Sequence, residues 1–346
     1  MSRQQKYGEK MDRRTFLKYS GVLGLGVAFG GLMPTSECVA FNKKLWKVTR
    51  TRLSMGTFCA ITVMHGSRAE ADDVIGKTFE EMDRVSRLLN RYESDSLVAV
   101  LNREGLLCHT PREVSDVIGR SLYFHQASGG AFDITVKPLV DLYKAHFEAH
   151  KTPPPEAQVG RVLNLVDARG VQLDGRTVRL AKEGMGITLD GIAKGYVIDC
   201  GARVMKGYGI EHALINAGGD IRAIGGRKSN IPWKVAVQDP KKTGPYAETL
   251  AMMDGAIATS GNYELYFDQE KLYHHIVDPK TGHSPVESTS VTVMTQNAMD
   301  ADALSTSVFV LGPREGKRCV GTIADTECLI LDSREQKVMS NGWPSG

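Results

Sequence analysis

Residues 258–312 read ATSGNYELYFDQEKLYHHIVDPKTGHSPVESTSVTVMTQNAMDADALSTSVFVLG and contain the clearest structural pattern in the chain. Ser290–Met294 alternates polar and apolar residues, which is typical of a strand with one buried face. A helix is expected to begin near Asp300, with Asp300 as its cap and with Asp302 and Thr306 four positions apart on one face. The stretch therefore predicts strands and a helix that bring polar side chains to a common cleft.

Three polar clusters in this stretch combine hydroxyls, imidazoles and carboxylates. They lie at 259–262, at His274-His275 before a turn at 278–282, and at 300–306. These groups together are what a hard cation and a phosphate ester require. A strand over 271–277 would point the two histidines to opposite faces, so only one can enter the cleft, as a general base or a phosphate contact. The alternative is a structural histidine and an ordinary helix cap with a hydroxyl bonded back to the helix.

Outside this stretch, strand and helix patterns alternate irregularly. Strands are predicted at 47–64, 171–180 with a turn at Asp174-Gly175, 213–216, 233–238 and 250–258. Helices are predicted at 69–89, 97–102 and 113–128, and a turn at Gly191 is expected to lead into a helix through Asp199. This order favours an α+β fold over a regular doubly wound sheet. The three prolines at 153–155 mark a loop or an insertion.

The charge of the chain is concentrated at its beginning. The 346 residues have a formal net charge of +3, but the first forty hold six of the 43 basic and three of the 40 acidic residues, which leaves 37 of each in residues 41–346. No clustered basic face is indicated, which argues against a nucleic-acid partner. The six cysteines form no C-x-x-C pair and no cluster with histidine, so a zinc site is not expected.

The first forty residues resemble an export signal. Residues 12–18 (DRRTFLK) resemble the twin-arginine motif, and the apolar run 21–33 is too short to span a bilayer. Small residues at 38 and 40 suit cleavage before Phe41. The chain is therefore divided into a signal at 1–40 and one domain at 41–346, exported to the periplasm by the twin-arginine machinery. A retained signal would leave the protein associated with the membrane, and Cys38 offers a lipoprotein alternative.

Two glycine-containing segments suggest turns near phosphate. In 187–196 (ITLDGIAKGY) a strand is expected to run into Asp190, and a helix start with Lys194 beside it would attract anions; the alternative is an aspartate cap with a solvated lysine. Residues 216–225 (NAGGDIRAIG) lack the Rossmann glycine order and favour a hairpin. The chain has no P-loop and no G-x-S-x-G motif.

Taken together, these blocks resemble the FAD:protein FMN transferases, the ApbE-like flavin transferases. The blocks occur in the family's order over about residues 50–331: MGT at 55–57, Tyr92 with Ser96 and Leu101-Asn102, GGAFDITV at 129–136 with Pro138, 189–195, 216–220, and the three clusters of 258–312. Each block alone is weak, but their order is specific. The resemblance implies a single α+β catalytic domain with mixed or antiparallel sheets and a cleft between two lobes.

The resemblance also implies a reaction and a site. Such enzymes bind FAD as substrate, use Mg²⁺, transfer FMN to a Thr or Ser hydroxyl of an acceptor flavoprotein and release AMP. The FAD site would comprise Met55, Tyr92, Ala131, Phe132, Asp133, Asp190, Tyr196 and Ile276. The metal would be held by Asp302, Thr306 and the main-chain carbonyl of Ala193, with His275 as the base and Lys194 nearby. The alternatives are an FAD pyrophosphatase, with the choice determined by side chains around Asn102, and a non-catalytic flavin-binding protein.

Overall fold

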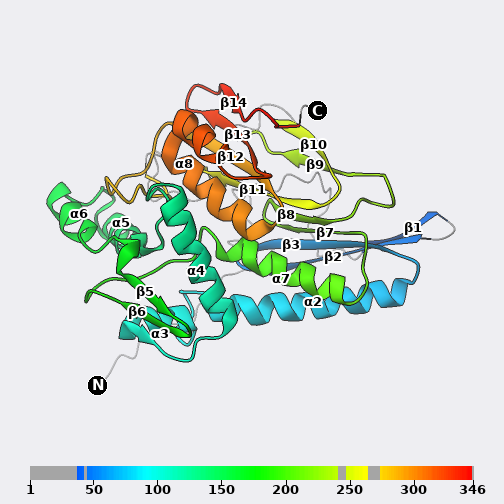
Figure 1. Ribbon diagram of the computed structural model, residues 1–346, viewed down its shortest axis with the longest axis horizontal. Helices are drawn as coiled ribbons and strands as arrows, with labels where there is room; N and C mark the ends of the chain where they lie inside the picture. Colours follow the sequence, from blue (N-terminus) through cyan, green and yellow to red (C-terminus); the bar gives the residue numbers. More distant parts are fainter. Residues whose placement is uncertain (1–36, 43–44, 241–246, 264–272, 345–346) are drawn as a thin grey trace, which may run out of the picture.

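A nine-stranded sheet forms the centre of the molecule (Figure 1). The computed structural model describes residues 45–240, 247–263 and 273–344, together with the backbone of 37–42. Across the sheet the strands are β1 (Glu37–Asn42), β2 (Leu45–Ser54), β3 (Thr57–His65), β7 (Ala213–Ala217), β8 (Asp220–Ile224), β11 (Gly255–Gly261), β12 (Ser288–Thr295), β13 (Glu327–Asp332) and β14 (Lys337–Met339). Every pairing in it is antiparallel, which agrees with the predicted α+β class.

Alternation along the strands decides what covers each face of this sheet. In β11, Ala256 and Ala258 belong to the main core under the helices, whereas Ile257 belongs to the core on the opposite face. The helical face is covered by α2 (Arg68–Leu89), α7 (Ala193–Gly207) and α8 (Ala298–Val320). The opposite face is covered by a two-stranded sheet of β9 (Trp233–Val237) and β10 (Glu248–Met252). The period-two pattern thus places the sheet between two apolar layers.

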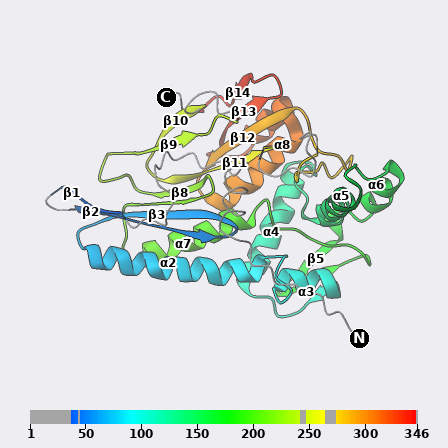
Figure 2. The ribbon, with the colours of Figure 1, turned by 180° about the vertical axis from the view of Figure 1, so that it is seen from behind.

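A second, mainly helical lobe lies at the end of the molecule away from β1 (Figure 2). Its elements are α3 (Leu97–Glu104), α4 (Arg112–Ala127), α5 (Lys137–His150) and α6 (Glu156–Leu163), two short 3₁₀ helices, η1 (Ile134–Val136) and η2 (Ala168–Gly170), and a small antiparallel sheet of β4 (Leu106–Leu107), β6 (Thr177–Leu180) and β5 (Val171–Asp174). The proline run at 153–155 is the connection between α5 and α6. Leu139, Tyr143 and Phe147 of α5 form a separate small core.

Several predicted boundaries differ from the structure for local reasons. The pattern over 250–258 contains two strands, because the chain turns at Gly255, whose φ is 123°. Residues 186–190 are not a strand, because Ile187 uses its N–H and its carbonyl to bond the Asn102 side chain instead of a neighbouring strand. α8 begins at Ala298 rather than near Asp300, and its cap is Asn297. It is interrupted at Gly312, where φ is 74°.

The predicted export signal falls almost wholly outside the described residues. Only its last part, 37–40, is described, and the backbone there forms most of β1, paired with β2. Among the helices of the described residues, none has the length and apolar character needed to cross a membrane.

Candidate active site

A cavity of about 1310 Å³ lies between the two lobes. The sheet lobe contributes residues of β11 and α8, and the helical lobe contributes residues 131–134, Val136 and four residues of α5. Ten of the predicted site residues line it: Tyr92, Ala131, Phe132, Asp133, Asp190, Lys194, His275, Ile276, Asp302 and Thr306. Segments that are more than two hundred residues apart in the chain therefore meet at one place.

Asp302 and Thr306 project from α8 toward the segment that leads into α7. Asp302 Oδ2 accepts a hydrogen bond from the Gly195 N–H at 3.0 Å, and Thr306 Oγ1 lies 3.2 Å from Ser260 Oγ. A Cβ placed on Gly191 would lie 3.0 Å from Thr306 Oγ1, so this glycine permits the close approach. Ala193 does not appear among the lining residues, but it lies in the chain between these two contacts.

The donors around Asp302 suit a hard cation. They are a carboxylate, the Thr306 hydroxyl and the Ser260 hydroxyl. Among the described residues, no group of three His, Cys, Asp or Glu side chains is placed to hold a metal. An ion here would therefore take one carboxylate and complete its shell with neutral oxygens, waters and substrate phosphate, which is the coordination that Mg²⁺ accepts.

Lys194 supplies the positive charge of this part of the cavity. Its Nζ lies 3.2 Å from Asp220 Oδ2, and the Asp220 side chain is only 2% exposed. Asp220 begins β8 directly after a glycine turn, in which Gly219 N–H donates to Asn216 Oδ1 at 3.0 Å. The 216–225 segment is therefore a hairpin, as predicted, and it also places a buried carboxylate next to Lys194. The spacing of residues in the sequence did not predict that Asp220 would pair with Lys194.

The two adjacent histidines have different surroundings. His275 lines the cavity, whereas His274 is 2% exposed and its ring packs edge-on against Phe309, with centroids 5.4 Å apart. His274 Nε2 lies 3.0 Å from the Pro285 carbonyl oxygen. Its main-chain N–H and carbonyl both bond the Ser284 hydroxyl. Because of these side-chain bonds, His274 forms only an isolated bridge, and no strand is present over 273–277.

Asp190 is part of a charged network at the cavity mouth. Its Oδ2 accepts from Arg91 Nε at 3.0 Å and from the Tyr92 hydroxyl at 3.1 Å. The Arg91 guanidinium lies 4.4 Å from the centre of the Tyr92 ring and also donates to Asp141 Oδ1 at 2.9 Å. Arg91 is 5% exposed and holds Tyr92 at the opening. Sequence reasoning missed Arg91, although its position next to Tyr92 was a signal.

The glycine pair at 129–130 shapes the wall formed by residues 131–133. Both glycines have positive φ values, 61° and 87°, which allow the chain to turn sharply after α4. Asp133 is then held by the N–H groups of Thr135 and Ala168, at 2.7 and 2.9 Å. His125 Nδ1 lies 3.3 Å from Asp133 Oδ2, and this hydrogen bond raises the pKa of His125 above its usual value. Asp133 thus borders the cavity while its oxygens hold neighbouring backbone.

Two predicted FAD contacts lie away from the cavity lining. Met55 has a φ of 52° in the turn between β2 and β3 and packs against the main core. Tyr196 is 5% exposed in the first turns of α7 and lines a different pocket, in which Arg203 lies 5.5 Å from its ring centre. Burial raises the pKa of Tyr196 to about 12.

The cavity also has a wall that the sequence patterns did not indicate. Lys144, Phe147 and Lys151 border it from α5 and its end, and Tyr273 faces them. The Tyr273 ring is stacked on Tyr143 at 5.8 Å and lies 5.3 Å from Phe147. The apolar residues at 139, 140, 143 and 147 have helical spacing, and this pattern could have predicted the helix. The wall offers flat apolar surface and positive charge, opposite the oxygen donors.

This arrangement is suited to phosphoester chemistry. Oxygen donors and Lys194 converge where a pyrophosphate would need its charge neutralised. His275 is an imidazole within the same cavity, and Tyr92 and Phe132 present aromatic rings suited to a planar heterocycle.

Comparisons with known proteins identify the family and agree with the fold. Residues 55–330 match the model of the ApbE family. The chain is 32% identical over 288 residues to a Treponema pallidum protein named FAD:protein FMN transferase, covering 76% of this chain and 78% of that one. A Haemophilus influenzae protein of the same name is 31% identical over 312 residues, 85% of this chain and 87% of that one. The crystal structure of the ApbE protein from Thermotoga maritima superposes with a TM-score of 0.78 at 28% identity, covering 86% of this chain and 97% of that one.

Proposed function

The chain belongs to the ApbE family, and we propose that it is an FAD:protein FMN transferase that moves FMN from FAD to a Thr or Ser hydroxyl of an acceptor protein and releases AMP. One observation carries the proposal: Lys194, His275 and the Asp302–Thr306 pair line the same cavity, together with the aromatic residues Tyr92 and Phe132.

Asp302, Thr306 and the main-chain carbonyl of Ala193 are the proposed ligands of Mg²⁺. The oxygen-only donor set described above supports this choice. When bound, the ion would neutralise charge on the pyrophosphate of FAD. Lys194 would bind the same phosphates from the other side, and its charge would be held in place by Asp220.

His275 is proposed to accept the proton of the attacking hydroxyl. A bond forms between that hydroxyl oxygen and the phosphorus of the FMN half, while the bond from this phosphorus to the oxygen of the AMP half breaks. AMP leaves with the electron pair of the broken bond, and the flavin stays on the acceptor through a phosphoester. Tyr92 and Phe132 would orient the substrate by contact with its planar rings, so that the attack is in line.

The direct test is transfer to an acceptor. Full-length protein is incubated with FAD, Mg²⁺ and an acceptor domain that contains a target threonine, and the acceptor is analysed by mass spectrometry. We expect covalent FMN on one hydroxyl and one AMP per flavin transferred, with both lost when EDTA removes the metal. FAD that binds without any adduct or AMP would contradict the proposal. AMP and free FMN at full rate without acceptor would identify a pyrophosphatase instead.

We also propose export through the twin-arginine machinery, on the basis of residues 12–18 and the apolar run 21–33. Replacing Arg13 and Arg14 by Lys should keep the protein in the cytoplasm, whereas the unchanged chain should reach the periplasm. Cell fractionation, with detection of the protein in the cytoplasmic and periplasmic fractions, measures the difference. Equal distribution of both forms would contradict the proposal.

A further inference from the structure

Helices α7 and α8 meet at a close junction, and each provides one half of the candidate metal site. α7 begins with Ala193 and Lys194, and α8 reaches Asp302 after its first turn. The junction is close because residue 195 has no side chain: a Cβ on Gly195 would lie 2.1 Å from the Ala298 carbonyl oxygen. The relative position of the two helices therefore determines where Asp302 lies with respect to the start of α7.

Asp199 holds the beginning of α8 with both of its carboxylate oxygens. Oδ1 accepts from the Ala298 N–H at 3.0 Å, and Oδ2 accepts from the Met299 N–H at 2.9 Å. The next N–H, of Asp300, donates to the Asn297 side chain at 2.9 Å. Side chains thus satisfy three of the four N–H groups that a helix start leaves without a helical partner, and Asp199 of α7 alone accepts from two of these three. Burial raises the pKa of Asp199 above its usual value, whereas the two main-chain N–H groups favour its charged form. In that form, Asp199 suits the positive end of the helix dipole.

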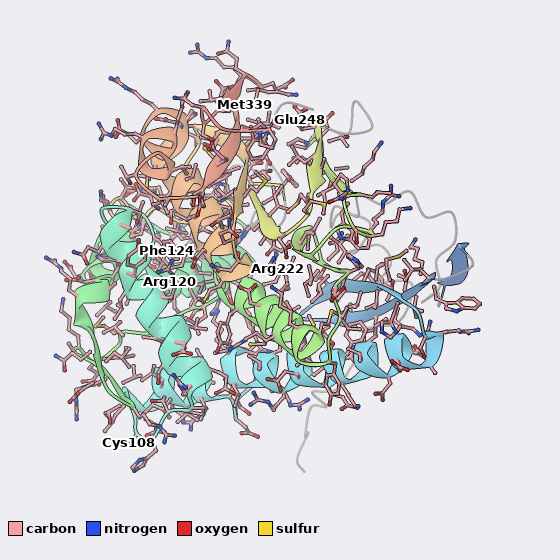
Figure 3. All side chains as sticks on the ribbon, turned by 45° about the vertical axis from the view of Figure 1, so that its right-hand side comes forward. Cys108, Arg120, Phe124, Arg222, Glu248 and Met339 are labelled. Atoms are coloured by element: carbon pink, nitrogen blue, oxygen red, sulfur yellow. The ribbon has the colours of Figure 1, made fainter. Side chains whose placement is uncertain are left out.

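Two arginines fix this junction to the rest of the protein (Figure 3). Arg222 of β8 places Nε 3.4 Å from Asp199 Oδ1 and donates to the Gly255 carbonyl at 2.7 Å. Arg120 of α4 binds both oxygens of Asp300, at 2.7 and 2.6 Å. The Asp199 side chain is 17% exposed and lines a second pocket, which shares no lining residue with the cavity. Its two hydrogen bonds to α8 connect it with the helix that carries Asp302.

We propose that Asp199 is a positioning residue for the metal site, which keeps Asp302 and Thr306 in register with Ala193 by holding Ala298 and Met299 against α7. The inference rests on the proposed Mg²⁺ site and extends it to a residue that does not touch the cavity. Asp199→Asn retains the shape but presents an NH₂ group to one of two N–H donors, so one bond and the charge are lost. Outer partners that bond metal ligands directly affect metal affinity by about 10-fold to 100-fold, and we expect about the lower end of this range for Asp199, which acts through the backbone of α8.

The test measures metal binding rather than turnover. Mn²⁺, a paramagnetic substitute for Mg²⁺, is titrated into full-length protein with FAD, and free Mn²⁺ is followed by electron paramagnetic resonance. We expect the Mn²⁺ dissociation constant of Asp199→Asn to rise about 10-fold or more, with an unchanged circular dichroism spectrum and unchanged FAD affinity without metal. Asp116→Asn is the control, because this exposed carboxylate lines the same pocket without binding α8; its constant should stay within about twofold.

A second readout separates positioning from general damage. In the transfer assay, excess Mg²⁺ should restore the kcat of Asp199→Asn, which would not happen if the variant were merely less folded. Mn²⁺ affinity equal to wild type in folded Asp199→Asn would overturn the inference. If Asp199→Asn does not fold, Asp199→Glu is the second variant. It keeps the charge beside Arg222, but its side chain is longer by one methylene group and shifts α8. Wild-type Mn²⁺ affinity in Asp199→Glu would also overturn the inference. The two proposals can fail separately. A wild-type protein that forms no flavin adduct would contradict only the transferase proposal, and a loss of Mn²⁺ affinity in Asp199→Asn would still support the positioning role.

Discussion

Lys194 Nζ lies 3.2 Å from Asp220 Oδ2, and this ion pair connects the start of α7 with the start of β8. The two partners differ in burial: the Asp220 side chain is 2% exposed, whereas that of Lys194 is 25% exposed and borders the cavity. One ammonium group thus compensates a buried carboxylate and faces the substrate. Its contributions to stability and to the reaction are separable by mutation.

Replacing Lys194 by Met should affect both properties. We expect kcat for FMN transfer to fall about 100-fold or more, as when one donor to a developing charge is removed. The free energy of unfolding should fall by about 1–3 kcal/mol, because Asp220 loses a charged donor. The double variant Lys194→Met/Asp220→Asn should regain part of the stability in urea unfolding and none of the activity. Recovery of activity in the double variant would show that Lys194 acts only on Asp220.

His275→Ala should lower kcat by about 100-fold to 10,000-fold, the usual contribution of a positioned base, while FAD binding is retained. His283→Gln is the matched control, because His283 lies outside the cavity lining and contacts Tyr143 and Glu156. Its transfer rate should stay within about twofold of wild type. Single-turnover rates with saturating FAD distinguish the two variants, and equal rates for both would exclude His275 as the base.

Gly195→Ala should destabilise the protein by about 1–3 kcal/mol or more. The added methyl group would overlap the Ala298 carbonyl of α8, which can move only if the helix backbone shifts. Gly76→Ala is the same substitution inside α2, where no atom lies within 4 Å of the added Cβ. It should stabilise by about 0.5–1 kcal/mol, because alanine is the better helix former. Thermal unfolding of the two variants compares them directly; a stable Gly195→Ala would contradict the close junction.

The His125–Asp133 contact should make stability depend on pH. Because the folded-state pKa of His125 is raised above its unfolded value, the folded protein binds its proton more tightly than the unfolded chain. This contribution is fully present below about pH 6.5 and is lost as the pH rises through the folded pKa. His125→Gln should therefore lose up to about 1 kcal/mol at pH 5.5 and much less at pH 8.5. Urea unfolding at both pH values measures the difference, and a pH-independent loss would contradict it.

The sequence predicted those parts of the fold that depend on local pattern. The strands on either side of Asp174-Gly175 and the helix at 69–89 were placed within a residue or two, because alternation and helical spacing are visible in a short window. A strand was predicted to run from Ile187 into Asp190, and none is present there. The Ile187 backbone is hydrogen-bonded to the side chain of Asn102, eighty-five residues earlier in the chain. A partner so distant in the sequence cannot be predicted from a local pattern.

The candidate site shows the same division. Asp302 and Thr306 lie on one helical face because their spacing is four, which the sequence states directly. Which histidine enters the cavity is decided by Ser284 and Pro285, which hold His274 in the interior. Asp300 was predicted as the N-cap of the helix, but the N-cap is Asn297, whose side chain accepts a hydrogen bond from the Asp300 N–H. The Asp300 carboxylate binds Arg120 instead. That arginine comes from α4, whose packing against α8 is a property of the tertiary structure.

The size of the cavity has a consequence for the order of events in the reaction. Small-molecule pockets usually enclose about 300–1,000 Å³, and the cavity of about 1310 Å³ is larger. In the proposed direct transfer, a loop of the acceptor chain would have to enter this cavity while FAD is still intact. Direct transfer in such a ternary complex requires no flavin bound covalently to the enzyme, so initial-rate plots should intersect rather than run parallel as in a ping-pong mechanism. AMP would then form only after both reactants have bound, which protects FAD from hydrolysis between encounters.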